Sequence, residues 1–265
     1  MIIIQTHWKN EKEGKIMIHV KNTTNNTGVT ISGDFHDLDA LYESLHKIVG
    51  TEGEWVNYES ARLRVLGVCY DIRHALMGNR EVSFVDNGLD SDKMKWLSIV
   101  ANEKNVYYSF NTYWPEILFV TMALNDFVWL YAKKQAKSSY DVMFDYRNIW
   151  DSTIATVRGF QAAIADCIKE TIPETSINRV LKLMNGSYIW FDHYATQYID
   201  ELNIKFIEMT PEKRLKNITV MAKRIAEQGD RYQDVKAAVM EAARDYNCKI
   251  TEIGHLGEYP EKIEW

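Results

Sequence analysis

Residues 60–78 read SARLRVLGVCYDIRHALMG, and we expect the fold to be organised around this stretch. It is apolar on almost every side of a helix, which is typical of a helix buried in the core. Ionised groups are rarely buried without a partner, so the charged side chains within it predict polar partners from elsewhere in the fold. These side chains are Arg62, Arg64, Asp71, Arg73 and His74.

Helical spacing places Arg62 and Arg73 on one stripe together with Leu66 and Cys69. The structural interpretation is that both arginines bury their stems and place their guanidinium groups in water or on a carboxylate. The alternative is an anion-binding pocket, because guanidinium groups suit carboxylate and phosphate and His74 can exchange a proton near neutral pH. We favour the structural interpretation, since structural ion pairs outnumber ligand sites in ordinary domains.

The composition is typical of a globular chain with a substantial core. Of its 265 residues 46% are hydrophobic, which allows one large domain or two small ones. Four prolines and 13 glycines argue against a loop-rich or disordered chain. The formal net charge of -6 disfavours nucleic acids and acidic membranes as partners. A helix expected from residue 211 has a basic outer face, but such a face is usually solvated.

The cysteines and the apolar stretches bear on the compartment. The three cysteines are widely spaced and form no CxxC pair, which indicates free thiols in a reducing environment. The longest apolar stretch, 117–132, is shorter than a membrane span and contains Asn125 and Asp126. With no signal peptide in view, we expect a soluble cytoplasmic protein without a membrane partner.

The first sixteen residues fit poorly with the rest of the chain. Glu13 and Gly14 can be encoded by codons that resemble a ribosome-binding site shortly before Met17. We therefore hypothesise that Met17 is the native start and that residues 1–16 are an upstream extension. N-terminal mass spectrometry of the protein from its own host tests this hypothesis.

Residues 17–135 are expected to form an α+β domain, with a small, mostly antiparallel sheet and helices packed on it. Short stretches rich in Ile, Val and Thr predict strands, and the asparagines and glycine between the first two strands predict a hairpin. Asp34 or Asp37 is the expected cap of a helix that ends near Val49. The strands are expected at 17–21, 29–35, 81–86 and 105–110. Further helices are expected at 60–78, from a cap at Ser91 or Asp92 to Val100, and at 116–134.

A polar connector over residues 133–148 is the expected boundary between two halves. Beyond it the sequence predicts helices only, with prolines at two helix starts and glycines at two breaks. Residues 149–265 are therefore expected to form a helical domain, or the helical half of a single domain. The expected helices span 151–170, 174–184, 188–206, 211–228 and 230–247.

Four segments carry a resemblance to a known family: NNTGVTISGDF (25–35), RVLGVCYDIRHALMG (64–78), WPEILFVTMALNDF (114–127) and MAKRIAEQ (221–228). Through them the chain from Met17 onward resembles an uncharacterised bacterial family of domains of unknown function. The resemblance implies a bacterial, cytoplasmic origin. It implies no catalytic residues, because no activity is assigned to that family.

Asp126 interrupts an apolar helix, and a buried carboxylate needs a cation or a proton. We expect it to pair with Arg62 or Arg73, which the stretch 60–78 supplies. Asp34 and His36 are expected near the same cluster. The candidate ligand-binding residues are therefore Arg62, Arg73, His74, Asp34, His36 and Asp126.

Metal and catalytic motifs give little support for an enzyme. Glu43-x-x-His46 and Asp71-x-x-His74 each place a carboxylate and an imidazole one helical turn apart, as in di-iron bundles. Both carboxylates fall on the polar side of their helices, and we expect no metal site and no cofactor. No GxSxG, HExxH or GxxxxGK(S/T) motif occurs, so no catalytic residue is predicted and the question of enzyme activity stays open.

Two hypotheses for the function follow. The first, which we favour, is a non-enzymatic binding or protein-interaction protein, with a protein partner or a second copy meeting an aromatic surface. The second is an enzyme or sensor for a small phosphate- or carboxylate-bearing ligand near residues 60–78. A pocket that reaches the arginines would favour the second, and a filled, paired cluster would favour the first. The aromatic surface is expected around Tyr107, Tyr108, Tyr113 and Trp114.

Overall fold

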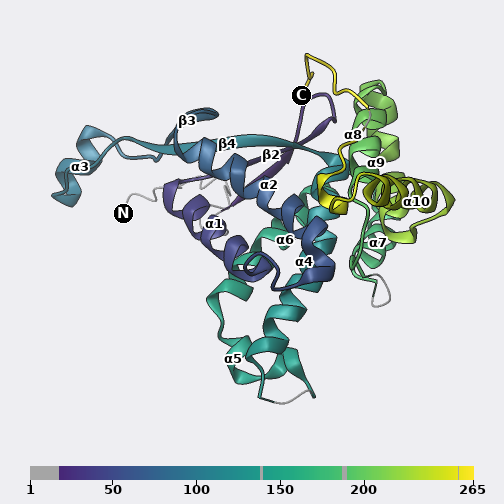
Figure 1. Cartoon of the computed structure of the whole chain (residues 1–265). Helices are drawn as coiled ribbons and strands as arrows, with labels where there is room; N and C mark the ends of the chain where they lie inside the picture. Colours follow the sequence, from purple (N-terminus) through teal and green to yellow (C-terminus); the bar gives the residue numbers. More distant parts are fainter. Residues whose placement is uncertain (1–17, 138–139, 187–189, 256) are drawn as a thin grey trace.

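The computed structural model describes residues 18–137, 140–186, 190–255 and 257–265. The hypothesis about Met17 and the upstream extension concerns residues outside this part of the chain. The fold is α+β, as the sequence predicts. A small antiparallel sheet lies in the N-terminal half, and the described C-terminal half is built from helices (Figure 1).

The sheet of the described chain consists of β1 (His19–Asn22), β2 (Gly28–Gly33), β3 (Glu81–Asp86) and β4 (Lys104–Tyr113). Their order is β1-β2-β4-β3, with every neighbouring pair antiparallel, and β1 and β2 form the predicted hairpin. β2 runs so close to β4 that a Cβ at Gly28 would lie 1.9 Å from the Thr112 carbonyl oxygen. β2 pairs with the second half of β4 and β3 with the first half, so β4 joins β3 to the rest of the sheet.

The described first half also contains α1 (Phe35–Val49), the short 3-10 turn η1 (Val56–Tyr58), α2 (Glu59–Leu76), α3 (Ser91–Leu97) and α4 (Trp114–Gln135). Asp34 caps α1 as predicted, because its side chain accepts a hydrogen bond from the backbone N–H of Asp37. α4 is the most deeply buried helix, and between Trp114 and Val128 nearly every side chain is covered. Pro115 lies in its first turn, where a missing N–H costs nothing.

Residues 59–76 form the predicted helix, but the prediction that it is buried on almost every side is wrong. α2 packs one face on α1 and α4, and Val65 and Ile72 on that face are fully buried. Leu63, Tyr70 and Met77 lie on another flank and are 45%, 54% and 65% exposed. Apolar spacing does not say which flanks of a helix other elements cover, and here one flank stays open.

The described second half contains α5 (Tyr146–Ile149), α6 (Ser152–Thr171), α7 (Glu174–Met184), α8 (Gln197–Ile207), α9 (Pro211–Glu227) and α10 (Asp230–Asp245), with 3-10 turns η2 (Val142–Phe144) and η3 (Ile250–Glu252). The helix expected over 188–206 is wrong in its first turns, since α8 begins at Gln197; residues 187–189 lie outside the described chain. Ahead of α8, the backbone N–H of Phe191 donates to Asp126 and that of His193 donates to the Asn57 carbonyl oxygen. These tertiary partners replace helical hydrogen bonds.

The two halves pack against each other around α4. α8 and α9 contact α4, and α6 contacts α1 and β1. Their buried side chains belong to one apolar cluster that includes Leu41, Phe119 and Ile225. Of the polar connector predicted over 133–148, the first residues continue α4 and the last enter η2 and α5.

One part of the chain projects from the body. β3, α3 and the first half of β4 extend beyond the helices as an arm, residues 81–107 (Figure 1). β3 is exposed along its whole length and forms one edge of the sheet. In the part of the chain that the structure describes, no helix combines the length and the apolar character needed to cross a bilayer.

Candidate functional site

The structure does not bring the six sequence-predicted site residues together. Arg62 donates from Nε to the Gly50 carbonyl oxygen at 3.1 Å and from Nη1 to Glu59 Oε1 at 2.8 Å. Arg73 is exposed, and its guanidinium lies 5.8 Å from the centre of the Tyr70 ring. Among the described residues, no side-chain hydrogen bond or ion pair joins any two of the six.

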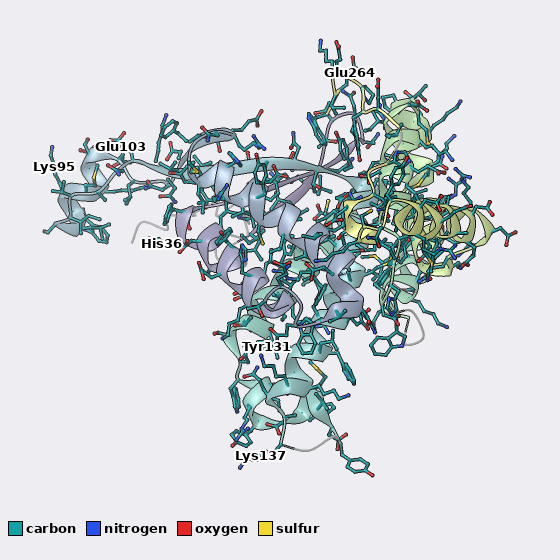
Figure 2. All side chains as sticks on the ribbon, viewed as in Figure 1. His36, Lys95, Glu103, Tyr131, Lys137 and Glu264 are labelled. Atoms are coloured by element: carbon teal, nitrogen blue, oxygen red, sulfur yellow. The ribbon has the colours of Figure 1, made fainter. Side chains whose placement is uncertain are left out.

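His74, Asp34 and His36 each have separate surroundings. The ring of His74 lies 4.2 Å from that of Tyr70. Asp34 is engaged as the cap of α1, where its Oδ1 accepts the Asp37 N–H at 2.8 Å. His36 lies at the start of the same helix, at its outer side (Figure 2). No common pocket for an anion results from these positions.

The expected ion pair between Asp126 and a buried arginine does not form. Asp126 is 5% exposed, and its Oδ2 accepts a hydrogen bond from the backbone N–H of Phe191 at 2.8 Å. Burial is the main cause that raises the pKa of Asp126 to about 7, and the charge of Asp192 adds to the rise. The hydrogen bond from Phe191 lowers the pKa but does not outweigh these two effects. A proton and a peptide N–H therefore satisfy this carboxyl group in place of a cation.

A different polar cluster lies where α2, α4, α8 and the C-terminal tail meet. Arg64 donates from Nη1 to Glu116 Oε2 at 3.0 Å and from Nη2 to Asp200 Oδ2. Asn203 Nδ2 donates to Glu116 Oε2 at 3.0 Å and to the Tyr259 hydroxyl at 3.2 Å. The Tyr259 hydroxyl in turn donates to Asp200 Oδ1 at 3.0 Å. These contacts close a ring, which we name the Arg64 cluster.

Each member of the Arg64 cluster is placed by a different part of the fold. Arg64 lies on the half-covered helix α2, and Glu116 lies in the first turn of α4, where a carboxylate is favoured by the helix dipole. Asp200 and Asn203 are three positions apart on α8 and so share one face of that helix. Tyr259 comes from the tail after α10. The cluster therefore exists only in the folded chain.

Burial and charge act in opposite directions within the cluster. The side chains of Arg64, Glu116 and Asp200 are 20%, 15% and 20% exposed. Burial raises the pKa of Glu116, while the Arg64 guanidinium and the Asn203 amide oppose the rise. Burial lowers the pKa of Arg64, but Glu116 and Asp200 outweigh it and the pKa rises. One permanent cation thus faces two carboxyl groups, so the ionised cluster carries a net negative charge.

The Arg64 cluster borders two neighbouring cavities of about 660 and 360 Å³. The larger lies between α2, β4 and the tail, and the smaller is bordered by α8 and by residues 251–255. Arg64, Gly67 and Glu116 line both. A Cβ at Gly67 would meet no atom within 4 Å, so the missing side chain keeps this part of α2 open. The larger volume suits a small molecule.

Two buried amide oxygens at these cavities have no hydrogen-bond partner among the described residues. They are Oδ1 of Asn203, which is fully buried, and Oε1 of Gln197, which is 6% exposed. The amide nitrogens are already engaged, Asn203 Nδ2 by Glu116 and Gln197 Nε2 by the carbonyl oxygens of Ile250 and Ile253. Buried acceptors are normally paired, so these two oxygens are exceptions in the described chain.

One wall of the larger cavity is aromatic. The Tyr113 ring stacks on Tyr259 at 5.7 Å and on Trp265 at 5.0 Å between ring centres. The tail that carries these rings is held by Asn25, whose Nδ2 donates to the Trp265 carbonyl oxygen at 2.9 Å. Of the aromatic surface predicted from sequence, Tyr113 therefore lines the cavity. Trp114 is fully buried, so its predicted place on a surface is wrong.

The family described as Domain of unknown function (DUF6904) matches residues 18–265. The chain belongs to this family. The DUF6904 match includes every residue of the Arg64 cluster and confirms the predicted resemblance to an uncharacterised domain family, whereas the bacterial source stays a prediction. No curated protein and no solved structure matches the chain. The description of DUF6904 names no activity, so the function has to be argued from the site itself.

Sequence reasoning missed the Arg64 cluster. Asp71, the carboxylate that the stretch 60–78 itself offers, pairs with Arg80 at 2.8 Å. The carboxylates that bind Arg64 lie 52 and 136 positions further along the chain. The one local signal was Glu116, a carboxylate in an otherwise apolar first turn of a helix. A carboxylate is also favoured there by the helix dipole, so this signal did not point to a site.

Proposed function

We propose that this protein binds a small organic cation in the 660 Å³ cavity beside the Arg64 cluster. The observation that carries the proposal is the polar lining of the cavity. The adjoining ring holds two carboxyl groups, those of Glu116 and Asp200, for one guanidinium. A ligand with hydrogen-bond donors and a positive charge complements this excess of carboxyl groups.

The other charged residues at this cavity agree with that choice. Asp71 and Arg80 pair with each other and so leave no net charge. Glu81 adds a further carboxylate at the lining. The electrostatic field in the cavity therefore favours a cation over an anion.

The two ends of the cavity suit the two ends of such a ligand. An ammonium, amidinium or guanidinium group can lie beside Glu116, which lines the cavity. The aromatic wall with Tyr113 and Tyr259 suits a flat, apolar portion. A cation next to Glu116 also lowers the pKa of its carboxyl group, against the rise that burial causes.

A phosphate- or carboxylate-bearing ligand has weaker support. One guanidinium group at this cavity, that of Arg64, already donates to Glu116, to Asp200 and, at 2.8 Å, to the Thr196 carbonyl oxygen. Arg62 lines a separate open cavity of about 950 Å³, where three glutamates accompany it; they are Glu43, Glu52 and Glu54. Neither arginine is left as an unengaged receptor for an anion.

We infer a non-enzymatic binding role in the bacterial cytoplasm, as in the first hypothesis from the sequence, but with a small ligand in place of a protein partner. The groups of the Arg64 cluster can hold and orient a ligand, and our proposal assigns them no reaction. The three cysteines are free. Burial raises the pKa of the Cys69 thiol to about 12 and that of Cys167 to about 11, which keeps both protonated and agrees with structural thiols in a reducing compartment.

Thermal unfolding with three probes of one shape tests the proposal. Benzamidine is cationic, benzamide is its neutral counterpart and benzoate is anionic. A ligand that binds only the folded state stabilises it by about 2.7 kcal/mol at a hundred times its dissociation constant. Benzamidine should therefore raise the Tm by several degrees at high concentration, benzamide should raise it less, and benzoate should leave it unchanged.

A matched pair of variants locates the site. Gly67→Phe fills the opening on α2, whereas Gly159→Phe adds the same side chain at another mid-helix glycine with no atom within 4 Å. The first variant should lose the response to benzamidine and the second should keep it. The proposal is wrong if benzoate stabilises as well as benzamidine, or if benzamidine, agmatine and spermidine all leave the Tm unchanged.

A further inference from the structure

The arm, residues 81–107, is exposed on both of its faces. β3 pairs with β4 and every one of its residues is exposed. Figure 2 shows Lys95 and Glu103 far out on the arm, away from the helical body. A two-stranded ribbon with no further packing is marginally stable in water. The arm therefore needs a covering surface that the rest of the described chain does not supply.

The arm exposes large apolar side chains among its polar ones. Trp96 is 83% exposed, Phe84 is 66% exposed and Val100 is completely exposed. Phe84 and Val85 are neighbours on one strand and so point to opposite faces of the ribbon. The other exposed apolar side chains of the arm are Val82, Leu97, Ile99 and Val106. Large apolar side chains exposed on one projecting element favour an interaction site.

The exposed area matches that of a stable protein interface. Together the apolar side chains of the arm expose on the order of 800 Å², which is about what each partner contributes to an interface of standard size. The arm also carries five carboxylates and three lysines. This acidic balance disfavours an anionic membrane surface as the occupant.

The same chain offers a second exposed apolar surface at the root of the arm. Leu63, Tyr70 and Met77 follow one another at intervals of seven along α2, which contacts β4. We name these three residues the α2 stripe. We infer that the protein forms a two-fold dimer in which the arm of each copy packs on the α2 stripe of the other. A two-fold arrangement buries both surfaces twice and leaves no open end.

The edge of β3 is a poorer contact than its faces. β3 begins at Glu81 and ends at Asp86. If two β3 edges paired antiparallel across the two-fold axis, Glu81 of one copy would lie opposite Asp86 of the other and the like charges would repel. In the proposed dimer, a face of the arm therefore packs on the α2 stripe of the other copy, and the two β3 edges do not pair.

Sedimentation velocity of the full chain tests this dimer and does not depend on any ligand. The wild type at micromolar concentration should sediment with twice the mass of the 30.9 kDa chain. The arm variant Phe84→Glu/Trp96→Glu/Val100→Glu should weaken the dimer at least about 100-fold, because buried anchors dominate interface energies. Met77→Glu, on the α2 stripe, should weaken it at least about tenfold.

The control replaces equally exposed aromatic side chains elsewhere. Phe144 and Trp150 are 76% and 83% exposed, and Phe144→Glu/Trp150→Glu should leave the dimer unchanged. All substituted side chains are exposed, so circular dichroism should show a folded chain in each case. The inference is overturned if the wild type is monomeric or if the arm variant dimerises like the wild type. It is also overturned if the control dissociates or if Met77→Glu has no effect on the dimer.

Discussion

Two carboxyl groups, the largely covered Glu116 and the buried Asp126, lie ten positions apart on α4 and are satisfied in different ways. Glu116 belongs to a ring of side chains from α2, α8 and the tail, and this ring borders two cavities. Asp126 accepts one backbone N–H, from Phe191, and no ion pair of the described chain includes it. Burial raises the pKa of both groups.

The difference separates a structural carboxyl group from a candidate ligand site. A lone carboxyl group can avoid the cost of a buried charge by keeping its proton, and Asp126 needs no other partner. Glu116 is held beside a permanent cation and a second carboxyl group, so its protonation is coupled to whatever charge enters the cavity. The following predictions test that contrast.

Loss of Arg64 should have the largest effect on stability. Arg64→Ala leaves Glu116 and Asp200 buried without their cation, which costs about 3–5 kcal/mol. Urea unfolding measures this cost. Arg80→Ala is the control, because Arg80 pairs with Asp71 at a more exposed position and should cost less than about 1 kcal/mol. Equal, small losses for both variants would show that the ring is no more than a surface ion pair.

Asp126→Asn should stabilise the protein at pH values above 7. Folding raises the pKa of Asp126 from 3.8 to about 7. Between these two pH values the folded state keeps a proton that the unfolded state loses, and at higher pH the folded state holds a buried charge. The wild type should therefore lose stability as the pH rises from about 4 to about 7. Asparagine keeps an acceptor for Phe191 and does not titrate, and the gain should be roughly 1–3 kcal/mol.

Urea unfolding at a series of pH values measures the effect. Asp166→Asn is the control, since Asp166 is exposed and pairs with Lys169. It should change the stability by less than about 0.5 kcal/mol and keep the pH dependence of the wild type. If Asp126→Asn instead destabilises the protein at every pH, the carboxylate has a charged partner and its contrast with Glu116 disappears.

Gly67→Ala should give a small gain at the cavity side of α2. Alanine is favoured over glycine inside a helix by about 0.5–1 kcal/mol, and the added Cβ meets no atom within 4 Å. Gly159→Ala, in α6, should give a similar gain for the same reason. A clear loss for Gly67→Ala alone, in the same unfolding measurement, would show that this flank of α2 is packed and that the cavity is closed there.

Elements with a local signal were predictable from the sequence. The side chain of Asp34 caps α1, prolines stand in the first turns of α4 and α9, and β1 and β2 form the expected hairpin. The start of α8 was not predictable, because the backbone ahead of it hydrogen-bonds to Asp126 and Asn57 from distant parts of the chain. The burial of α2 was overestimated because spacing reveals an apolar flank but not what covers it.

The candidate site was beyond sequence reasoning for a related reason. Arg62 and Arg73 have the pattern of a pocket, yet each interacts with neighbours on or next to its own helix. Arg64 has no such pattern, and its partners come from α4 and α8, far away in the sequence. Which arginine meets which carboxylate depends on helix packing, and a single sequence does not encode that in any local pattern.

Calorimetric titration of benzamidine at several pH values tests the central claim most directly. A cation beside Glu116 favours the ionised carboxylate, so binding should release protons and become tighter as the pH rises through the raised pKa of Glu116. The titration should use the Asp126→Asn background, so that a second buried carboxyl group does not contribute. Glu116→Gln in that background should bind benzamidine more weakly, with no proton release and no pH dependence. Equal affinity with and without Glu116, or tighter binding at low pH, would contradict the account.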